Sequence, residues 1–408
     1  MSAPEAPVPD SAQVGAIPYW RLSSFYFFYF ALLGSWLPYW PLYLRDLGYS
    51  AAAIGVLAGT LQGTKVIAPN LWGWLADRSG ERLRIVRLGA VAAVLIFSLI
   101  FFRSGFAWLV VIVAGYSFFW NAVHAQFEVI TLGHLREQVQ RYSLVRVWGS
   151  IGFIVAVLVL GWLFDQVALR TLPFILLALL LAIWGSTLSI AKPPAINRAA
   201  VQQRDPLRMI LRQPAVLAFF AINFLLQVSH GPYYTFFSVY LESHHYSRTQ
   251  TGLLWSLGVI AEVAMFLLMH RVLRRVSLRA IVIGSLALTA LRWFLIARYV
   301  DVLPILLFAQ CLHAVSFASQ HACAVEMVRR SFAGGNEGQG MALYSGVCYG
   351  GGAAVGAVLS GLLWAGQPTA TFYGAAVVVL IALLIAYKWL RPLQRNLASV
   401  LDSPAVSA

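Results

Sequence analysis

Apolar residues run along this chain in long blocks, and short polar stretches separate the blocks. Each block holds about 20 residues, the length that a helix needs to cross the hydrocarbon core of a membrane. The pattern therefore predicts an all-α membrane protein with twelve transmembrane helices. The predicted helices lie near residues 19–44, 50–76, 84–102, 106–132, 142–165, 168–190, 214–242, 247–270, 279–297, 302–328, 338–364 and 368–389.

The polar connections place most basic residues on one side of the predicted membrane. If alternate loops share a side with both tails, that side holds 21 of the 29 Lys and Arg residues, the other side holds 5 and the spans hold 3. Short loops rich in Lys and Arg stay in the cytoplasm. We therefore predict a multi-pass protein of the cell (inner) membrane with both termini cytoplasmic. The N-terminal tail lacks the basic region of a secretory signal, so the first block is expected to remain as a span.

The longest polar connection divides the predicted helices into two sets of six. We predict a cytoplasmic tail (1–18), an N-terminal half (19–190), a cytoplasmic linker (191–213), a C-terminal half (214–390) and a second cytoplasmic tail (391–408). An offset of 197 residues aligns segment 34–50 with segment 231–247 without a gap, as expected of an internal repeat. The same offset pairs Lys65 with Glu262, and His124 with His321.

Composition narrows the classes of function. Charged residues make up 11% of the chain, whereas about 25% of an ordinary globular domain is charged. The net charge of +14 comes from short loop clusters, so it reports topology and no nucleic-acid partner is expected. Cys311, Cys323 and Cys348 fall in apolar blocks without metal-ligand spacing, so we expect no disulfide framework, no metal and no cofactor.

The chain is not expected to be an enzyme, because no nucleophile and base occur at hydrolase or metalloprotease spacing. Its expected partners are the lipid bilayer and a small molecule, and we expect a monomer.

One carboxylate and one guanidinium lie inside neighbouring apolar blocks. Glu128 and Arg146 are almost equally distant from the polar turn between their helices, so they are predicted to lie at equal depth and to face each other. An unpaired charge at that depth is costly, and intramembrane charges commonly mark substrate or ion sites. The alternative is a structural ion pair that holds the two helices together.

A second group of ionisable residues lies in the C-terminal half. Glu262 and Arg292 flank another basic turn and are predicted to lie near the middle of the membrane, while His313, His321 and Glu326 follow in the next block. A carboxylate near a cation at that depth suits a group that must load and release a proton. The roles of His321 and Glu326 stay open, since both could be ordinary polar residues near a helix end.

The loop after the second predicted helix resembles a motif of the major facilitator superfamily. That motif has the form G-x-L-A-D-R-x-G-R-R, and here Gly73, Asp77, Arg78 and Gly80 match it while Glu81 replaces the first basic residue of the final pair. The resemblance implies two six-helix halves of the major facilitator fold and a loop that acts as a conformational latch. The corresponding loop of the second half keeps its basic residues but lacks the glycines.

The spacing of Glu128 and Arg146 resembles that of the oligosaccharide:proton symporters of this superfamily. The resemblance implies that these two residues hold substrate hydroxyls and that an aromatic residue, here Phe153, stacks on the sugar. It also implies proton coupling by Glu262, Arg292 and His313. Ser316 stands where those symporters have a second acid, so Glu262 becomes the preferred proton carrier.

Segments from both halves resemble the phenylpropionate permease branch more closely. They are residues 145–150 (VRVWGS), 230–234 (HGPYY), 252–263 (GLLWSLGVIAEV) and 291–293 (LRW). The resemblance implies proton-coupled uptake of an aromatic monocarboxylate. Lys65, Arg146 and Arg292 offer positive charge for such a substrate, and Asn121 is a further candidate contact. The candidate residues for a ring-binding slot are Tyr26, Tyr29, Phe30, Trp120, Tyr233 and Tyr234.

The hypothesis is therefore an alternating-access symporter in which Arg146 anchors a carboxylate, Glu128 orients Arg146 or senses substrate, and Glu262 with Arg292 couples the proton. Substrate, stoichiometry and transport direction stay open. Two alternatives remain: a sugar or nucleoside proton symporter, in which Glu128 and Arg146 bind hydroxyls, and a membrane scaffold or sensor that no longer transports.

Overall fold

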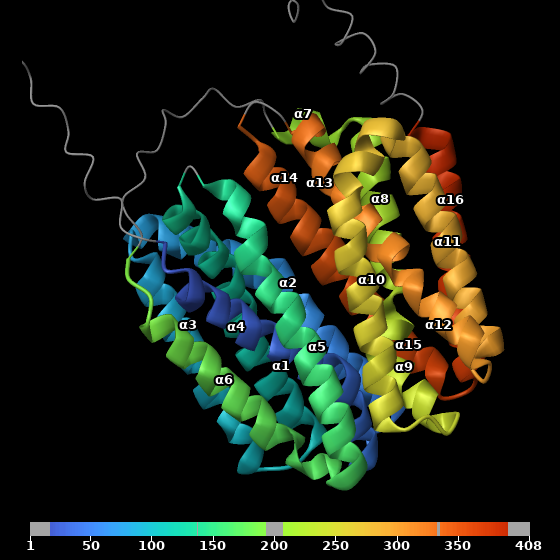
Figure 1. Ribbon diagram of the computed structural model, residues 1–408, viewed down its shortest axis with the longest axis horizontal. Helices are drawn as coiled ribbons and strands as arrows, with labels where there is room; N and C mark the ends of the chain where they lie inside the picture. Colours follow the sequence, from blue (N-terminus) through green and yellow to red (C-terminus); the bar gives the residue numbers. More distant parts are fainter. Residues whose placement is uncertain (1–16, 137, 193–206, 333–334, 391–408) are drawn as a thin grey trace, which may run out of the picture.

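The computed structural model describes residues 17–136, 138–192, 207–332 and 335–390, and these residues are helical almost throughout (Figure 1). The predicted all-α fold is confirmed. Within the described residues, eleven helical segments are long and apolar enough to cross a membrane. The helix α1 (Tyr19–Asp46) is equally long, with 28 residues, but its many Tyr, Trp and Pro residues make it less apolar. With α1 the segments number twelve, and their ends lie within five residues of the predicted ones.

The N-terminal half contains the first six of these segments. They are α1, α2 (Ala51–Ser79), α3 (Arg82–Ser98) with η1 (Leu99–Phe101), α4 (Phe106–Leu135), α5 (Tyr142–Gln166) after η2 (Val139–Arg141), and α6 (Leu172–Leu188) after η3 (Leu169–Thr171).

The C-terminal half contains the other six segments, and three of them are built from more than one helix. They are α8 (Pro214–Ser229) with α9 (Gly231–Ser243), α10 (Arg248–Arg275), α11 (Leu278–Tyr299), α12 (Leu303–Cys311) with η4 (Ala314–Ser319) and α13 (Gln320–Ser331), α14 (Glu337–Leu343) with η5 (Tyr344–Gly352) and α15 (Ala353–Trp364), and α16 (Pro368–Trp389); the short α7 (Leu207–Leu211) precedes them. Both η4 and η5 are π-helices.

Serine caps begin equivalent helices in the two halves. The Ser50 hydroxyl accepts a hydrogen bond from the backbone N–H of Ala53 at the start of α2. Ser247 caps α10 in the same way and completes a capping box with Gln250. The 197-residue offset aligns these two serines, so the repeat seen in the sequence coincides with a repeated local structure.

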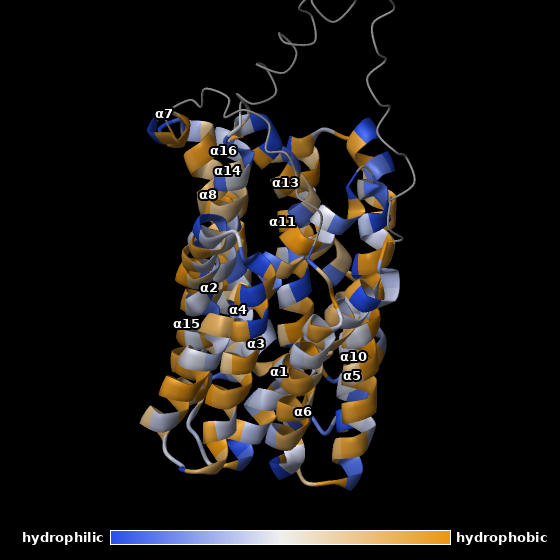
Figure 2. Ribbon diagram, turned by 90° about the vertical axis from the view of Figure 1, so that its left-hand side faces the viewer, coloured by the Kyte–Doolittle hydropathy of each residue, from blue (hydrophilic) through white to orange (hydrophobic). Residues whose placement is uncertain are grey.

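The bundle has two distinct ends. We call the end where α1 begins and α16 finishes the basic end, because the helix ends and turns there carry Arg78, Arg136, Arg271 and Arg329. We call the other the far end. Figure 2 shows hydrophilic residues at both ends and a smaller number between the apolar surfaces in the middle of the bundle.

The two halves contact each other mainly where α2 packs against α15 and η5 and where α5 packs against α10, and α1 also meets α9. In the described part of the chain, the side-chain hydrogen bonds and ion pairs that join the halves all lie at the far end. Asp165 at the end of α5 accepts from the backbone N–H groups of Arg248 (2.9 Å) and Thr249 (3.0 Å) and from the Thr249 hydroxyl (2.6 Å). An ion pair between Arg45 and Glu242 adds to this closure.

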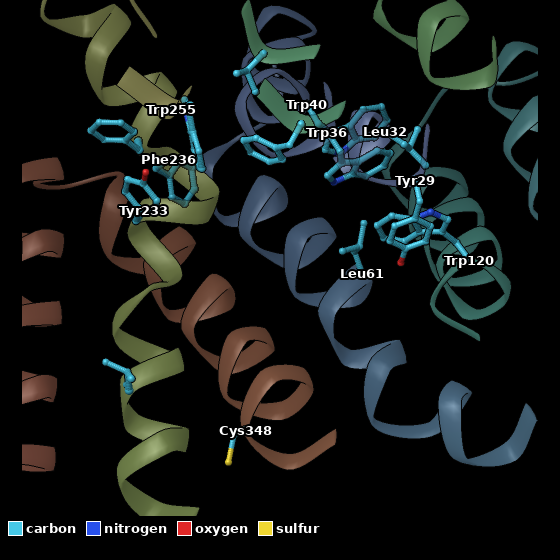
Figure 3. Packing of buried hydrophobic residues seen from close by; sticks show 14 of the residues in the cluster. Tyr29, Leu32, Trp36, Trp40, Leu61, Trp120, Tyr233, Phe236, Trp255 and Cys348 are labelled. Carbon is cyan, nitrogen blue, oxygen red and sulfur yellow. The ribbon is translucent and has the colours of Figure 1, made fainter. Parts of the chain in front are cut away.

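Aromatic side chains fill much of the buried interior near the interface of the halves. Trp36 and Trp40 stack with their ring centroids 4.1 Å apart, and Tyr29 stacks on Trp120 at 4.6 Å. In Figure 3 these rings lie on one side, while Tyr233 and Trp255 lie on the other. The interior is therefore rich in flat surfaces that suit a ring-shaped ligand as well as packing.

Candidate functional site

Glu128 and Arg146 lie on α4 and α5, as predicted, but they do not contact each other. Glu128 accepts a hydrogen bond from the Tyr142 hydroxyl at the start of α5. The Arg146 guanidinium lies over the ring of Phe30 at 3.9 Å and near that of Tyr26 at 5.7 Å. No ion pair within 4.0 Å joins these two described residues in this conformation.

Arg146 is therefore a cation held on aromatic faces. No carboxylate of the described chain forms an ion pair with it, and the side chain is partly exposed. A guanidinium held in this way keeps its N–H donors for a planar anion such as a carboxylate. Tyr142, which donates the hydrogen bond to Glu128, was not among the predicted site residues. In the sequence, only its position directly after the polar turn, at the start of the helix, pointed to it.

The ring wall beside Arg146 comes from α1 and α4. Tyr29 lies between two rings, with Trp120 stacked at 4.6 Å and His124 at 4.5 Å. The indole nitrogen of Trp120 and Nε2 of His124 are buried and have no hydrogen-bond partner in the part of the chain that the structure describes. These two unused polar groups make the wall a candidate contact surface for a ligand as well as part of the core.

Asn121 and Lys65 lie where α4 meets α2. The Asn121 side-chain amide donates to the Thr64 hydroxyl (2.8 Å) and to the Leu61 carbonyl (3.3 Å), so it ties the two helices together. Lys65 is the next residue after Thr64, is partly exposed, and forms no ion pair within the described chain. The Lys65 ammonium group is therefore available to a ligand, whereas the Asn121 amide is already engaged in hydrogen bonds between the two helices.

Phe153 lies two turns beyond Arg146 on α5 and is buried. Its ring centroid lies 6.3 Å from that of Trp255 on α10, so the residue contacts the other half of the molecule. The backbone of α5 at this position also approaches α1 closely, since a Cβ on Gly34 would lie 2.8 Å from the Phe153 carbonyl oxygen. Phe153 thus lies at the interface of the two halves, where its ring could contact a ligand bound between them.

The C-terminal half brings Arg292, His313 and Glu262 together. The Arg292 side chain is 0% exposed and donates to the Ala309 carbonyl (3.1 Å), His313 Nδ1 (3.1 Å) and the Ser316 hydroxyl (3.1 Å). The other ring nitrogen of His313, Nε2, lies 3.6 Å from Glu262 Oε2. His313 therefore stands between the cation and the carboxylate, which do not touch directly.

This arrangement determines where His313 carries its proton. A guanidinium can only donate, so His313 Nδ1 must accept, and a neutral imidazole then has its proton on Nε2, facing Glu262. The π-helix η4 begins directly after His313 and contains Ser316. The side chains of His313 and Ser316 both accept hydrogen bonds from Arg292. The ring of Tyr233 lies 4.2 Å from the guanidinium and completes its enclosure.

Glu262 lies on α10, which packs against α5, the helix of the other half that carries Arg146. Glu262 keeps 20% of its side chain exposed, whereas His313 keeps 6%. A carboxylate that is partly exposed between the halves can exchange a proton with water that enters there.

The loop motif forms a separate cluster at the basic end. Arg82 donates to both Asp77 and Gln126, and a Cβ on Gly73 would lie 3.4 Å from the Gln126 amide. Gly80 ends α2 with φ +68°, a conformation that favours glycine.

The remaining polar groups near this end form local contacts. Arg78 stacks 5.5 Å over Trp74, and the pKa of Glu81 is lowered by its hydrogen bond from Lys192 (2.8 Å). Glu326 binds Arg329 and Arg330 of its own helix at the basic end, away from Arg292.

Comparison with known proteins places these features in context. The model of the MFS_1 like family matches residues 19–375. The probable 3-phenylpropionic acid transporter of Escherichia coli (strain K12) is 28% identical over 372 residues, covering 89% of this chain and 96% of the relative. The maltose permease of Geobacillus stearothermophilus is 25% identical over 273 residues, covering 66% of this chain and 68% of the relative.

A solved structure of a variant of the nucleoside transporter NupG has the same fold. Its TM-score to this chain is 0.79 at 20% sequence identity, and the alignment covers 91% of this chain and 100% of that one. At this identity the likeness concerns the fold alone.

Proposed function

Because this chain belongs to the MFS_1 like family, and so is a multi-pass secondary transporter with the major facilitator fold, we propose that it is a proton-coupled symporter of a small organic anion. The observation that carries the proposal is the pair of sites described above. One half holds a guanidinium on aromatic faces, and the other holds a buried Arg292–His313–Glu262 network.

The substrate is a phenylpropionate-like aromatic acid. Arg146 binds its carboxylate, and Glu128, which accepts a hydrogen bond from Tyr142, senses the bound substrate. The rings of Trp120 and Phe153 contact the apolar part, while Lys65 adds positive charge and Asn121 supports the wall. The likeness to a probable 3-phenylpropionic acid transporter supports this substrate class.

Glu262 is the proton carrier. When Glu262 binds a proton, it loses its negative charge, so its attraction to His313 and, through His313, to Arg292 becomes weaker. Alternating access couples this change to movement of one half against the other. No step needs a cofactor, and a monomer suffices because one chain supplies both halves of the site.

The basic end faces the cytoplasm in this proposal, as the excess of Lys and Arg in its loops indicates. Both described ends of the helical bundle, at Tyr19 and Trp389, then lie on the cytoplasmic side. With this orientation, the ties at the far end close the outer side, as expected of an inward-facing transporter.

The anchoring role of Arg146 is tested by uptake of labelled 3-phenylpropionate into vesicles under an inward proton gradient. We expect Arg146→Ala to lower uptake by about 100-fold, because a charge-assisted hydrogen bond to an ionised group contributes roughly 1.5–3 kcal/mol and this substitution removes a pair of them. Arg146→Lys should lose most of this activity too, since an ammonium cannot bind a carboxylate with two parallel bonds.

The matched control is Arg103→Ala, which removes an exposed arginine from a far-end loop and should leave uptake unchanged. Uptake by Arg146→Ala at the rate of this control would contradict the anchoring role.

A sugar or nucleoside symporter is the second candidate function. The Glu128–Tyr142 pair offers hydrogen-bonding groups that suit hydroxyls. A maltose permease is similar to this chain in sequence, and a nucleoside transporter is similar in fold. Competition of labelled 3-phenylpropionate uptake by maltose and by nucleosides separates the two candidates. Substrate-induced alkalinisation outside the vesicle separates both from a scaffold or sensor, which would move no protons.

A further inference from the structure

His321, whose role the sequence left open, lies at the centre of a polar and aromatic cluster in the C-terminal half. Its Nδ1 atom lies 3.3 Å from the Tyr344 hydroxyl and 3.2 Å from the Tyr349 hydroxyl. The rings of Phe317 and Tyr344 stack against the imidazole with centroids 6.1 and 5.9 Å away. We call His321, Phe317, Tyr344 and Tyr349 the His321 cluster.

Both π-helices of the molecule's described part meet at this cluster. His321 follows η4 by two positions, and both tyrosines belong to η5. A π-helical stretch has poorer packing than an α-helix, and such stretches occur frequently at functional sites. Two of them converging on one histidine indicate that the local backbone is shaped to present these side chains.

The cluster has a counterpart in the N-terminal half. The 197-residue offset pairs His321 with His124, and His124 is likewise enclosed by aromatic rings, stacking on Tyr29 at 4.5 Å and meeting Phe30 edge-on at 5.7 Å. Arg146 lies over that same Phe30. The two histidines are thus equivalent elements of the repeat, on opposite sides of the interface.

The repeat relates the His321 cluster to the proposed substrate anchor. His124, the counterpart of His321, meets the same Phe30 ring that Arg146 lies over, and the side chain of His321 is partly exposed. The two tyrosines occupy Nδ1, whereas Nε2 has no hydrogen-bond partner among the described residues. When a tyrosine hydroxyl donates to Nδ1, the neutral imidazole carries its proton on Nε2 and can donate it to a ligand.

We propose that His321 determines substrate specificity by donating a hydrogen bond from Nε2 to an oxygen at the end of the substrate remote from Arg146. This inference rests on the proposed function, because it takes Arg146 as the carboxylate anchor. The ligand class is then an aromatic acid with a hydroxyl on its ring. The aromatic faces of Phe317 and Tyr349 pack against that ring, and the phenol oxygen accepts from His321.

The test compares binding of 3-(4-hydroxyphenyl)propionate with binding of 3-phenylpropionate, measured as competition with labelled 3-phenylpropionate on the purified transporter. We expect the intact protein to prefer the hydroxylated acid by about tenfold, as one buried hydrogen bond allows. In His321→Phe the preference should disappear, while affinity for 3-phenylpropionate stays within about threefold, because no hydrogen bond to the plain ring is lost.

Two further variants separate specificity from stability. His321→Gln keeps an N–H donor and should retain part of the preference, even if the larger change to Phe impairs folding. Tyr349→Phe removes one partner of Nδ1 and should weaken the preference without abolishing binding. The matched control is His270→Phe, a change at an exposed histidine on α10 that should keep the full preference.

The inference is overturned if the intact protein does not prefer the hydroxylated acid, or if His321→Phe and His321→Gln keep the preference of the His270→Phe control. A failure of the proposed function has a different signature. In that case Arg146→Ala would bind both acids as well as the intact protein does, whatever happens at His321.

Discussion

Arg146 and Arg292 show two ways in which a buried helix can hold a guanidinium. Arg146 lies on the rings of Phe30 and Tyr26, so its hydrogen-bond donors stay available. Arg292 instead donates from Nε to the Ala309 carbonyl and from Nη1 to His313 and Ser316, and it is completely buried, with Nη2 unpaired among the described residues. An arginine with free, partly exposed donors suits a ligand, whereas a fully buried one with most of its donors engaged suits a fixed electrostatic role.

Substitution of Glu262 tests the proton-coupling proposal most directly. Glu262→Gln keeps the shape of the side chain but cannot bind and release a proton. We expect uptake driven by a proton gradient to fall by at least about tenfold, while exchange of labelled for unlabelled substrate across the membrane persists, since exchange needs no net proton movement.

The control for this variant is Glu337→Gln, an exposed carboxylate at the start of α14. Accumulation against a gradient by Glu262→Gln at the level of this control would show that another group carries the proton.

At the scale of elements, the two halves come closest where glycines replace side chains. A Cβ on Gly55 of α2 would lie 2.7 Å from the Ala357 carbonyl oxygen and 2.8 Å from the Gly361 Cα, both on α15. Helices that pack backbone to backbone depend on such small residues, above all in membranes. The contact between α2 and α15 is therefore sensitive to added volume.

Gly55→Ala should disturb the contact between the halves. The added methyl group meets backbone atoms, which cannot rotate away, so α2 and α15 must separate. We expect transport to fall by about fivefold or more and the melting temperature to drop, because overpacking of a tight contact costs roughly 1–3 kcal/mol.

Gly284→Ala on α11 provides the matched substitution, since nothing lies within 4 Å of its added Cβ. It should transport normally and melt at the same or a slightly higher temperature, as alanine favours a helix over glycine. Equal melting temperatures and transport rates for the two variants would show that the close approach of α2 and α15 is not required.

At the scale of the whole molecule, a few polar ties hold the far end closed. Asp165 accepts hydrogen bonds from the backbone at the start of α10, and Arg248 in turn donates to the Phe164 carbonyl at 2.6 Å. These groups link α5 of one half to α10 of the other. In a transporter that alternates between two states, such ties set the population of the state that they join.

Asp165→Ala should shift the population away from the closed far end. Loss of its hydrogen bonds is worth about 1.4 kcal/mol or more, which corresponds to a tenfold change in the equilibrium. We expect a cysteine introduced at Thr235, which lies between the halves, to react about tenfold faster with a reagent added from outside. The measurement requires a background without the three native cysteines.

Asp46→Ala is the control, because Asp46 pairs with Arg170 of the same half at 4.0 Å and both side chains are well exposed. Such a pair contributes little, so the labelling rate should not change. If Asp165→Ala and Asp46→Ala gave the same rate, the far-end ties would not control access.

The sequence by itself determined the number and length of the helices. Bilayer thickness requires a minimum length of apolar residues, and loops must be polar, so these features can be counted without knowing how helices pack. The 197-residue offset likewise found equivalent residues, such as the capping serines Ser50 and Ser247, because a repeat preserves local sequence.

Only the tertiary structure decided which charged side chains meet. Equal distance from a turn predicts equal depth, but each residue of a helix rotates the side chain by about 100°, so depth does not determine direction. Arg146 therefore lies on Phe30 of α1, and Glu128 is bonded to Tyr142.

The same reason explains the network in the C-terminal half. A π-helix changes the rotation of every residue that follows it, and no residue pattern in the chain predicted η4 or η5. Three-dimensional packing, which orients helices about their own axes, placed His313 between Arg292 and Glu262 and brought His321 to its two tyrosines.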